Sequence, residues 1–65
     1  MLAVEWNRDY PTGTLVEVTL ADGRTINTRT LGQAKAWGGL DHVEVAGITG
    51  YVLLSWVTPR RVFAR

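Results

Sequence analysis

The chain contains no cysteine and a single histidine. Without cysteine it can form neither a disulfide nor a thiolate metal site, and one imidazole is too few for a zinc cluster. Disulfides, metals and oligomerisation are the usual supports of very small domains. At 65 residues, we therefore expect a compact core or a partner chain to supply the stability, and we expect no metal and no cofactor.

Long apolar runs are also missing. The stretch YVLL, residues 51–54, is far shorter than the roughly 18 residues that span a bilayer. The N-terminal stretch MLAVEWNRDYP carries Glu5 early and has no extended apolar segment, so we expect no signal peptide. These features, with the lack of cysteine, predict a soluble cytoplasmic protein with no membrane partner.

Charge of either sign is nearly balanced. Seven Lys and Arg against six Asp and Glu give a net charge of +1. Strong electrostatic binders of nucleic acid are usually far more basic. Three of the cations, Arg60, Arg61 and Arg65, do fall in the last six residues. A hydrophobic content of 46% favours a folded chain over a disordered one.

Helix signals are scarce, and the one candidate, residues 32–37 (GQAKAW), is short and bracketed by glycines. Strand signals are frequent. Residues 14–20 (TLVEVTL) alternate apolar and polar side chains, and Asp22-Gly23 supplies a tight hairpin turn into the Thr-rich residues 24–30. Gly38-Gly39 predicts a loop or a bulged strand start. The period-2 pattern thus indicates a largely β protein.

The second half of the chain continues the pattern. Residues 40–47 (LDHVEVAG) alternate again, and residues 51–57 (YVLLSWV) predict a strand that Pro59 ends. Residues 60–65 can supply a short last strand, with Val62 or Phe63 returning to the core. The apolar positions that share the inward phase predict one core: Val16, Val18, Ile26, Val43, Val45, Val52 and Val57.

Four or five short strands in one domain leave few architectures. A two-layer sandwich of the immunoglobulin type needs a longer chain, whereas a strongly bent five-stranded barrel fits. We therefore predict an all-β fold, a five-stranded small barrel covering residues 1–65 as a single domain.

The stretch TGYVLLSWVTP, residues 49–59, resembles the end of a Src-homology-3 (SH3) domain. Gly50, Tyr51, Val52 and Val57 match the family's run, Trp56 takes the place of its aromatic, and Trp37 lies 19 positions before Trp56. The resemblance covers about the last third of the chain and implies an SH3-like barrel with a single 3₁₀ turn before the last strand.

This chain departs from the SH3 pattern in three ways. Leu53 replaces the proline of the family's binding groove, and AVEWNRDYPTG does not match the family's opening motif or its acidic loop. The spacing between Gly13 and Trp37 is also longer than in the family. The resemblance therefore predicts the barrel and not proline-peptide binding. The pair GTLVEVTLADGR and GYVLLSWVTP is also similar in style to small bacteriophage and prophage proteins, which implies no particular activity.

The leading candidate for a binding site consists of large side chains that the strand alternation turns away from the core. The alternation turns Tyr51, Leu53 and Trp56 away from the core, and the 19-residue spacing places Trp37 beside them. Tryptophan is rarely fully buried and is enriched in binding hot spots. We expect a protein-binding surface, with core or rim packing of Trp37 and Trp56 as the alternative.

Other residues have competing interpretations. Trp6 and Tyr10 precede the first strand, where they can cap an open end of the barrel or swap onto a neighbouring chain. His42 and Glu44 share a strand face, which an acid–base pair needs but which any polar face also shows. With no cysteine nucleophile, Gly-x-Ser-x-Gly elbow or phosphate loop, we expect no enzyme.

Two further function classes stay open. Arg29, Arg60 and Arg61 could contact phosphates in a nucleic-acid-binding barrel, although the terminal pair also suits a solvated chain end. A structural homo-oligomer could bury the aromatic side chains between copies. The leading hypothesis is a non-catalytic protein-interaction module, in the manner of a phage-encoded accessory protein.

Overall fold

Six short strands and one short α-helix make up the fold in the computed structural model, which describes residues 2–60. In chain order the elements are α1 (Ala3–Asp9), β1 (Leu15–Thr19), β2 (Thr25–Arg29), β3 (Lys35–Trp37), β4 (Leu40–Glu44), β5 (Tyr51–Leu53), the 3₁₀ turn η1 (Leu54–Trp56) and β6 (Val57–Pro59). At seven residues, α1 falls well short of the length that a bilayer-crossing helix needs, and it is the one α-helix within residues 2–60.

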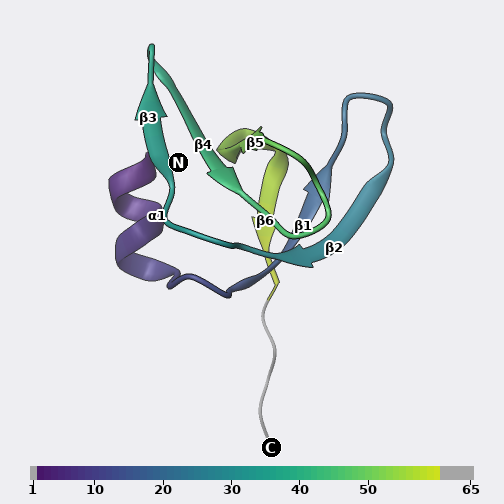
Figure 1. The fold of residues 1–65 in the computed structure, drawn as a ribbon, viewed down its shortest axis with the longest axis horizontal. Helices are drawn as coiled ribbons and strands as arrows, with labels where there is room; N and C mark the ends of the chain where they lie inside the picture. Colours follow the sequence, from purple (N-terminus) through teal and green to yellow (C-terminus); the bar gives the residue numbers. More distant parts are fainter. Residues whose placement is uncertain (1, 61–65) are drawn as a thin grey trace, which may run out of the picture.

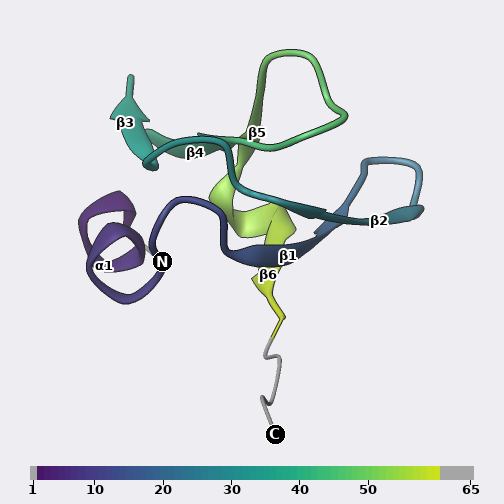
Figure 2. The ribbon, with the colours of Figure 1, turned by 60° about the horizontal axis from the view of Figure 1, so that its bottom comes forward.

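The strands form two antiparallel sheets of three strands each, in the orders β2-β1-β6 and β3-β4-β5 (Figure 1). The view in Figure 2 separates them into two layers, with α1 beside them. After β2 the chain passes from the first sheet to the second: Thr30 forms a bridge with Val45, and the Leu31 N–H donates to the Glu44 carbonyl at 2.9 Å. This bridge ties the two sheets together at one corner.

The architecture corrects the predicted one. The fold is mostly β and includes a helix, its strands number six and not five, and within residues 2–60 the two sheets do not close into a barrel. Two differences from the prediction account for the strands: β3 forms directly before Gly38-Gly39, and η1 divides the strand predicted at residues 51–57 into β5 and β6. Gly38 and Gly39 both have positive φ, so they form a two-residue turn that pairs Trp37 with Leu40.

The helix lies in a segment for which no helix was predicted. Residues 32–37, the one weak helix candidate, contain β3, and α1 forms at Ala3–Asp9. A helix of this length is not stable alone. Trp6 supplies the missing stabilisation because only 2% of it is exposed and it packs in the core, with its ring 4.5 Å from that of Tyr10. The N-terminal segment therefore caps its own domain, and Tyr10 is half-buried against the core.

Asn7 joins α1 to the segment that leads into β3. Its side-chain amide donates to the Ala34 carbonyl at 2.9 Å and accepts from the Ala34 N–H at 2.8 Å. The Asn7 side chain thus makes the two hydrogen bonds that a neighbouring strand would otherwise make with the backbone of Ala34, a residue that is almost fully buried. Without it, both backbone groups of Ala34 would lose their partners.

We expect Asn7→Ala to lower the free energy of unfolding by about 1–3 kcal/mol, the usual cost of leaving buried polar groups unpaired. Urea unfolding followed by circular dichroism measures the change. Asn27→Ala is the matched control, since Asn27 is exposed on β2. Equal stability of the two variants would show that the Asn7 bridge does not hold the helix in place.

One core fills the space between the sheets and the helix. Six of the seven predicted core residues are buried; Ile26 is the exception, and it is half-buried because β2 is an edge strand of its sheet. The buried set is Ala3, Trp6, Val16, Val18, Ala34, Val43, Val45, Val52, Leu54 and Val57, with Thr30 and His42 as buried polar residues.

The C-terminal part of the fold differs from the prediction in one detail. Residues 51–57 do not form one strand, because η1 interrupts it and Val57 begins β6. The 3₁₀ turn implied by the SH3 resemblance is therefore confirmed. Pro59 ends β6, an edge strand where its missing N–H is tolerated. The last strand predicted at residues 60–65, with Val62 or Phe63, lies outside the described residues beyond Arg60.

Candidate binding surface

One face of the second sheet points away from the core. Cross-strand partners lie on the same face, and the register pairs Trp37 with Leu40, His42 with Leu53, and Glu44 with Tyr51. Val43 and Val52 alternate with these residues and are buried. The outward residues define what we call the aromatic face: Lys35, Trp37, Leu40, His42, Glu44, Tyr51 and Leu53.

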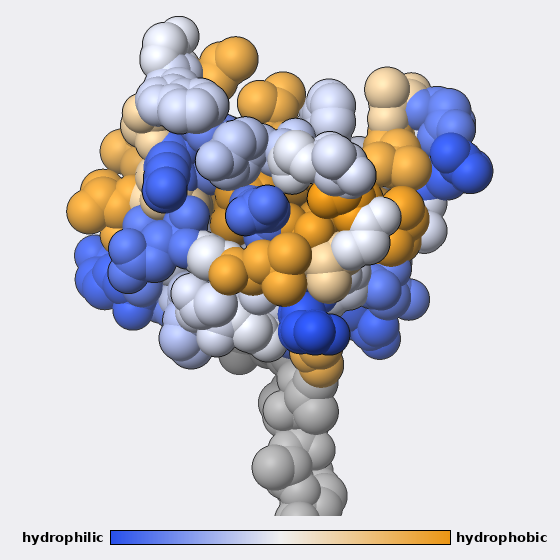
Figure 3. All heavy atoms as spheres, in the orientation of Figure 1, coloured by the Kyte–Doolittle hydropathy of each residue, from blue (hydrophilic) through white to orange (hydrophobic). Residues whose placement is uncertain are grey.

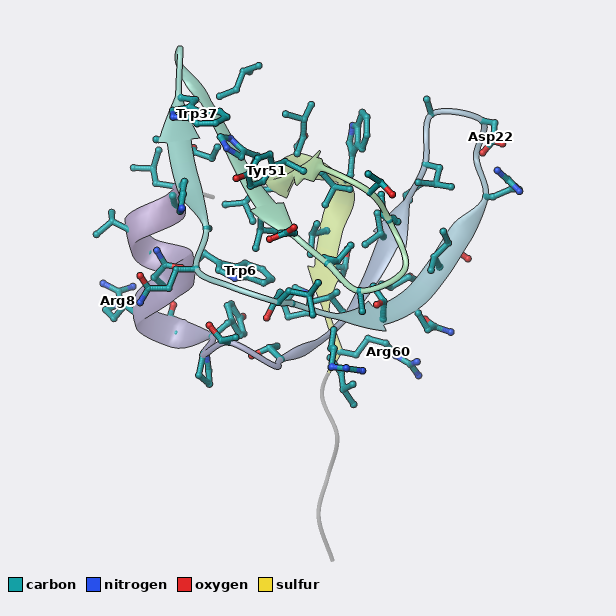
Figure 4. All side chains as sticks on the ribbon, in the orientation of Figure 1. Trp6, Arg8, Asp22, Trp37, Tyr51 and Arg60 are labelled. Atoms are coloured by element: carbon teal, nitrogen blue, oxygen red, sulfur yellow. The ribbon has the colours of Figure 1, made fainter. Side chains whose placement is uncertain are left out.

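Three rings are in contact at the centre of this face. The Trp37 and Tyr51 rings meet edge to face with centroids 5.5 Å apart, and His42 lies 5.0 Å from Trp37 and 4.7 Å from Tyr51. Trp37 is 62% exposed and Tyr51 48% exposed, whereas only 6% of His42 is exposed. The two large rings therefore cover the imidazole and present their own surface to solvent, side by side in Figure 4.

His42 lies buried beneath the two larger rings. Its Nδ1 lies 3.4 Å from the Leu40 carbonyl oxygen, and its buried Nε2 has no hydrogen-bond partner among residues 2–60. Glu44 is exposed on the same strand and forms no hydrogen bond with His42 within that range. The geometry thus gives His42 a packing role between rings, and it does not assemble the His42–Glu44 acid–base pair that the strand phase allowed.

A shallow hollow of about 220 Å³ borders the aromatic face. It is lined by Gly39, Leu40, Asp41, Leu53, Leu54 and Ser55. Leu40 and Leu53 belong to both the hollow and the aromatic face, so the two surfaces are continuous. Over the part of the molecule that carries the second sheet, the space-filling view in Figure 3 shows hydrophobic residues interspersed with pale residues of intermediate hydropathy and with hydrophilic ones.

The four predicted protein-binding residues are placed as follows. Trp37 and Tyr51 are in ring contact, and Leu53 is half-buried on the same face. Trp56 lies on η1 and is 37% exposed, directly after Ser55 of the hollow. As predicted, Val52 and Val57 are buried, Tyr51 and Trp56 are exposed and Leu53 is half-buried, but strict alternation ends at η1, where Leu54 is buried and Ser55 and Trp56 are both exposed.

The predicted arginines lie elsewhere. Arg29 and Arg60 line a second hollow of about 250 Å³ together with Leu15, Asn27 and Thr28. Figure 4 places Arg60 at the opposite end of the molecule from Trp37 and Tyr51. Arg61, the third residue of that prediction, lies outside the described residues.

Ion pairs lie away from the aromatic face. Arg8 pairs with Asp9 at 3.1 Å and Arg24 with Asp22 at 2.7 Å, with all four side chains well exposed. The side-chain hydrogen bond from Arg8 lowers the pKa of Asp9 below its ordinary value, and the same bond raises the pKa of Arg8. Exposed pairs of this kind contribute little to stability. Among residues 2–60, no three His, Asp or Glu side chains gather as they would around a metal ion.

Sequence reasoning did not assign four residues of the aromatic face to the binding surface: Lys35, Leu40, His42 and Glu44. The two that matter most to its shape are Leu40 and His42. A two-residue Gly38-Gly39 turn would have revealed both, because it sets Trp37 opposite Leu40 and brings the next outward residue, His42, under the rings.

Comparison with known proteins places the chain in no established group: no family model matches it, and no curated protein and no solved structure shows significant similarity. The class defined by its fold is a small, mostly β domain of two three-stranded antiparallel sheets with one short helix.

Proposed function

We propose that the protein is a non-catalytic protein-interaction module that binds its partner through the aromatic face, the adjoining hollow and Trp56, which follows Ser55 of that hollow. The observation that carries this proposal is the ring-contacting pair Trp37 and Tyr51, whose side chains are 62% and 48% exposed. Rigid aromatic side chains give large contact area at low entropy cost, which suits protein recognition.

The ring contacts support a preorganised surface. Trp37 packs on both His42 and Tyr51, so its position is fixed before any partner arrives. Binding then costs less conformational entropy than it would with a free side chain. The short β3–β4 turn, in which both glycines have positive φ, holds Trp37 at the end of the sheet.

The hollow beside the aromatic face suits an apolar side chain of the partner. Leu40, Leu53 and the buried Leu54 form its apolar walls. Asp41 and Ser55 supply polar groups at the same hollow, and within residues 2–60 no cation lies within 4 Å of Asp41. This chemistry favours a partner segment with an apolar anchor and a neighbouring cation or hydrogen-bond donor.

We further propose that the two sheets are an open variant of the SH3-like barrel. Three features support this: β1 pairs with β6, η1 directly precedes β6, and the Thr30–Val45 bridge connects the sheets. The groove proline is Leu53, so the proposal does not extend to proline-rich ligands. A cytoplasmic, phage-encoded accessory protein fits this size and fold.

Self-association is the competing use of the same surface. The aromatic face could be covered by a second copy, and a structural homo-oligomer would then replace the module. Light scattering over a concentration series separates the two, because a homo-oligomer buries the face without a foreign partner. A stable dimer at about 100 µM or below would favour that alternative.

We expect Trp37→Ala and Trp56→Ala each to weaken partner binding by more than about tenfold, since hot-spot truncations typically cost about 2 kcal/mol or more. Both side chains are exposed, so the variants should still unfold cooperatively. The partner is first captured from the source cell with the wild-type chain and identified by mass spectrometry. Its affinity for each variant is then measured by calorimetry.

Two controls sharpen this experiment. Val4→Ala changes an exposed apolar residue on α1 and should leave affinity unchanged. Arg60→Ala combined with Arg61→Ala should have a much smaller effect than either Trp variant. If the arginine pair dominates and binding collapses between about 50 and 200 mM salt, a nucleic-acid interface explains the data and the aromatic proposal fails.

A further inference from the structure

The second hollow is lined by two arginines that flank the central strand β1, Arg29 on β2 and Arg60 just after β6. In the order β2-β1-β6, Leu15 of the central strand faces Arg29 of β2 in the strand register. On the other side of β1, the Arg60 backbone N–H donates to the Leu15 carbonyl at 2.8 Å. Leu15 thus has one arginine beside it on each flank, and all three residues line the hollow.

From this arrangement we propose that the hollow is a binding site for a phosphate group, held between Arg29 and Arg60. Strands two positions apart are separated by about 10 Å. Two arginine side chains extending from that separation can converge on a single oxyanion. The planar guanidinium donates two parallel hydrogen bonds to phosphate oxygens, which a single lysine does not.

The charges around the hollow favour an anion. Among residues 2–60, no carboxylate lies within 4 Å of either arginine, because the carboxylates in ion pairs there are those of Asp9 and Asp22. Asn27 is exposed at the hollow and offers a further amide donor. The Thr28 hydroxyl is already engaged, since it donates to the Ala46 carbonyl at 2.7 Å.

One acidic residue limits the affinity. Glu17 follows Leu15 on the outward face of β1 and faces Asn27 in the register, so its carboxylate lies near the hollow without lining it. It repels an anion at the site. Leu15, which is 46% exposed, adds an apolar surface on which an organic group attached to the phosphate can rest.

The site is independent of the proposed protein-binding function, because it lies at the opposite end of the molecule from the aromatic face (Figure 4). The phosphate could come from a small phosphorylated molecule or from a nucleic-acid backbone. Both sources present the same oxyanion, and the probes below distinguish them.

Calorimetry with pyrophosphate and with a short oligothymidylate tests the proposal on the full chain. Arg29→Gln and Arg60→Gln should each weaken pyrophosphate binding by at least about tenfold, as expected for loss of a charge-assisted hydrogen bond. Arg24→Gln is the matched control, since it removes the same charge from an exposed arginine paired with Asp22. It should change the affinity less than about twofold, as is usual for an exposed charge remote from a site. Glu17→Gln should strengthen binding.

Each outcome has a clear meaning. Tighter binding of the oligothymidylate than of pyrophosphate, with a steep salt dependence, would assign the site to nucleic acid. Comparable or tighter binding of pyrophosphate would assign it to small phosphates. An equal loss in Arg24→Gln and Arg29→Gln would show a general charge effect and overturn the site, as would failure of both probes to bind. Thermal melting of every variant confirms that the fold is retained.

Discussion

Val45→Asp is expected to abolish cooperative unfolding. Val45 has no exposed surface, and its bridge with Thr30 lies at the corner that joins the two sheets. A buried carboxylate without a partner costs several kcal/mol. A domain of this size has only about 3–5 kcal/mol of stability, so the variant should lose its folded state.

Thermal and urea unfolding monitored by circular dichroism measure this effect. Leu31→Asp is the control, because it places the same carboxylate on a nearby apolar residue that is 47% exposed. That variant should melt almost as the wild type does. A normal melting curve for Val45→Asp would mean that the two sheets do not share the core described above.

Trp6→Ala should have the second largest effect. Truncating a buried tryptophan typically costs about 3–5 kcal/mol, which equals the stability expected for the whole domain. Trp6 is 2% exposed and joins α1 to the same core as the strand valines. We therefore expect loss of the helix together with a broad, weakly cooperative or absent unfolding transition.

Val4→Ala is the control for this substitution, since Val4 lies on the same helix and is 73% exposed. Its melting temperature should stay close to that of the wild type. Stability of Trp6→Ala near the wild-type value would contradict the packing of α1. It would favour the other interpretation of the N-terminal segment, in which Trp6 swaps onto a neighbouring chain.

Period-2 alternation predicted the parts of the fold in which one strand face is buried. Val16 and Val18 in β1 follow it, as do Val43 in β4 and Val45 in the bridge just after it. A half-buried strand has to alternate, because successive side chains point to opposite faces. The same regularity predicted that Tyr51 faces outward, so much of the candidate surface was accessible from sequence.

Features that depend on tertiary contacts could not be predicted from the sequence. The N-cap residue of α1, Leu2, has an apolar side chain, so only the Glu5 carboxylate marks the helix start, by accepting from the Leu2 N–H at 3.3 Å, and burial of Trp6 stabilises the helix. Strand β3 consists of three exposed residues, so it has no alternation in burial, and the Gly38-Gly39 turn was its one signal in the sequence. His42 is buried by two rings from neighbouring strands, which no pattern within β4 could predict.

NMR mapping of the bound partner on the labelled chain tests whether the aromatic face is the binding surface. We expect the Trp37 indole N–H and the amides of β3, β4 and β5 to shift most on titration, while the amides near Leu15, Arg29 and Arg60 stay in place. Shifts centred on Leu15, Arg29 and Arg60, with the Trp37 indole unchanged, would show that the partner binds elsewhere.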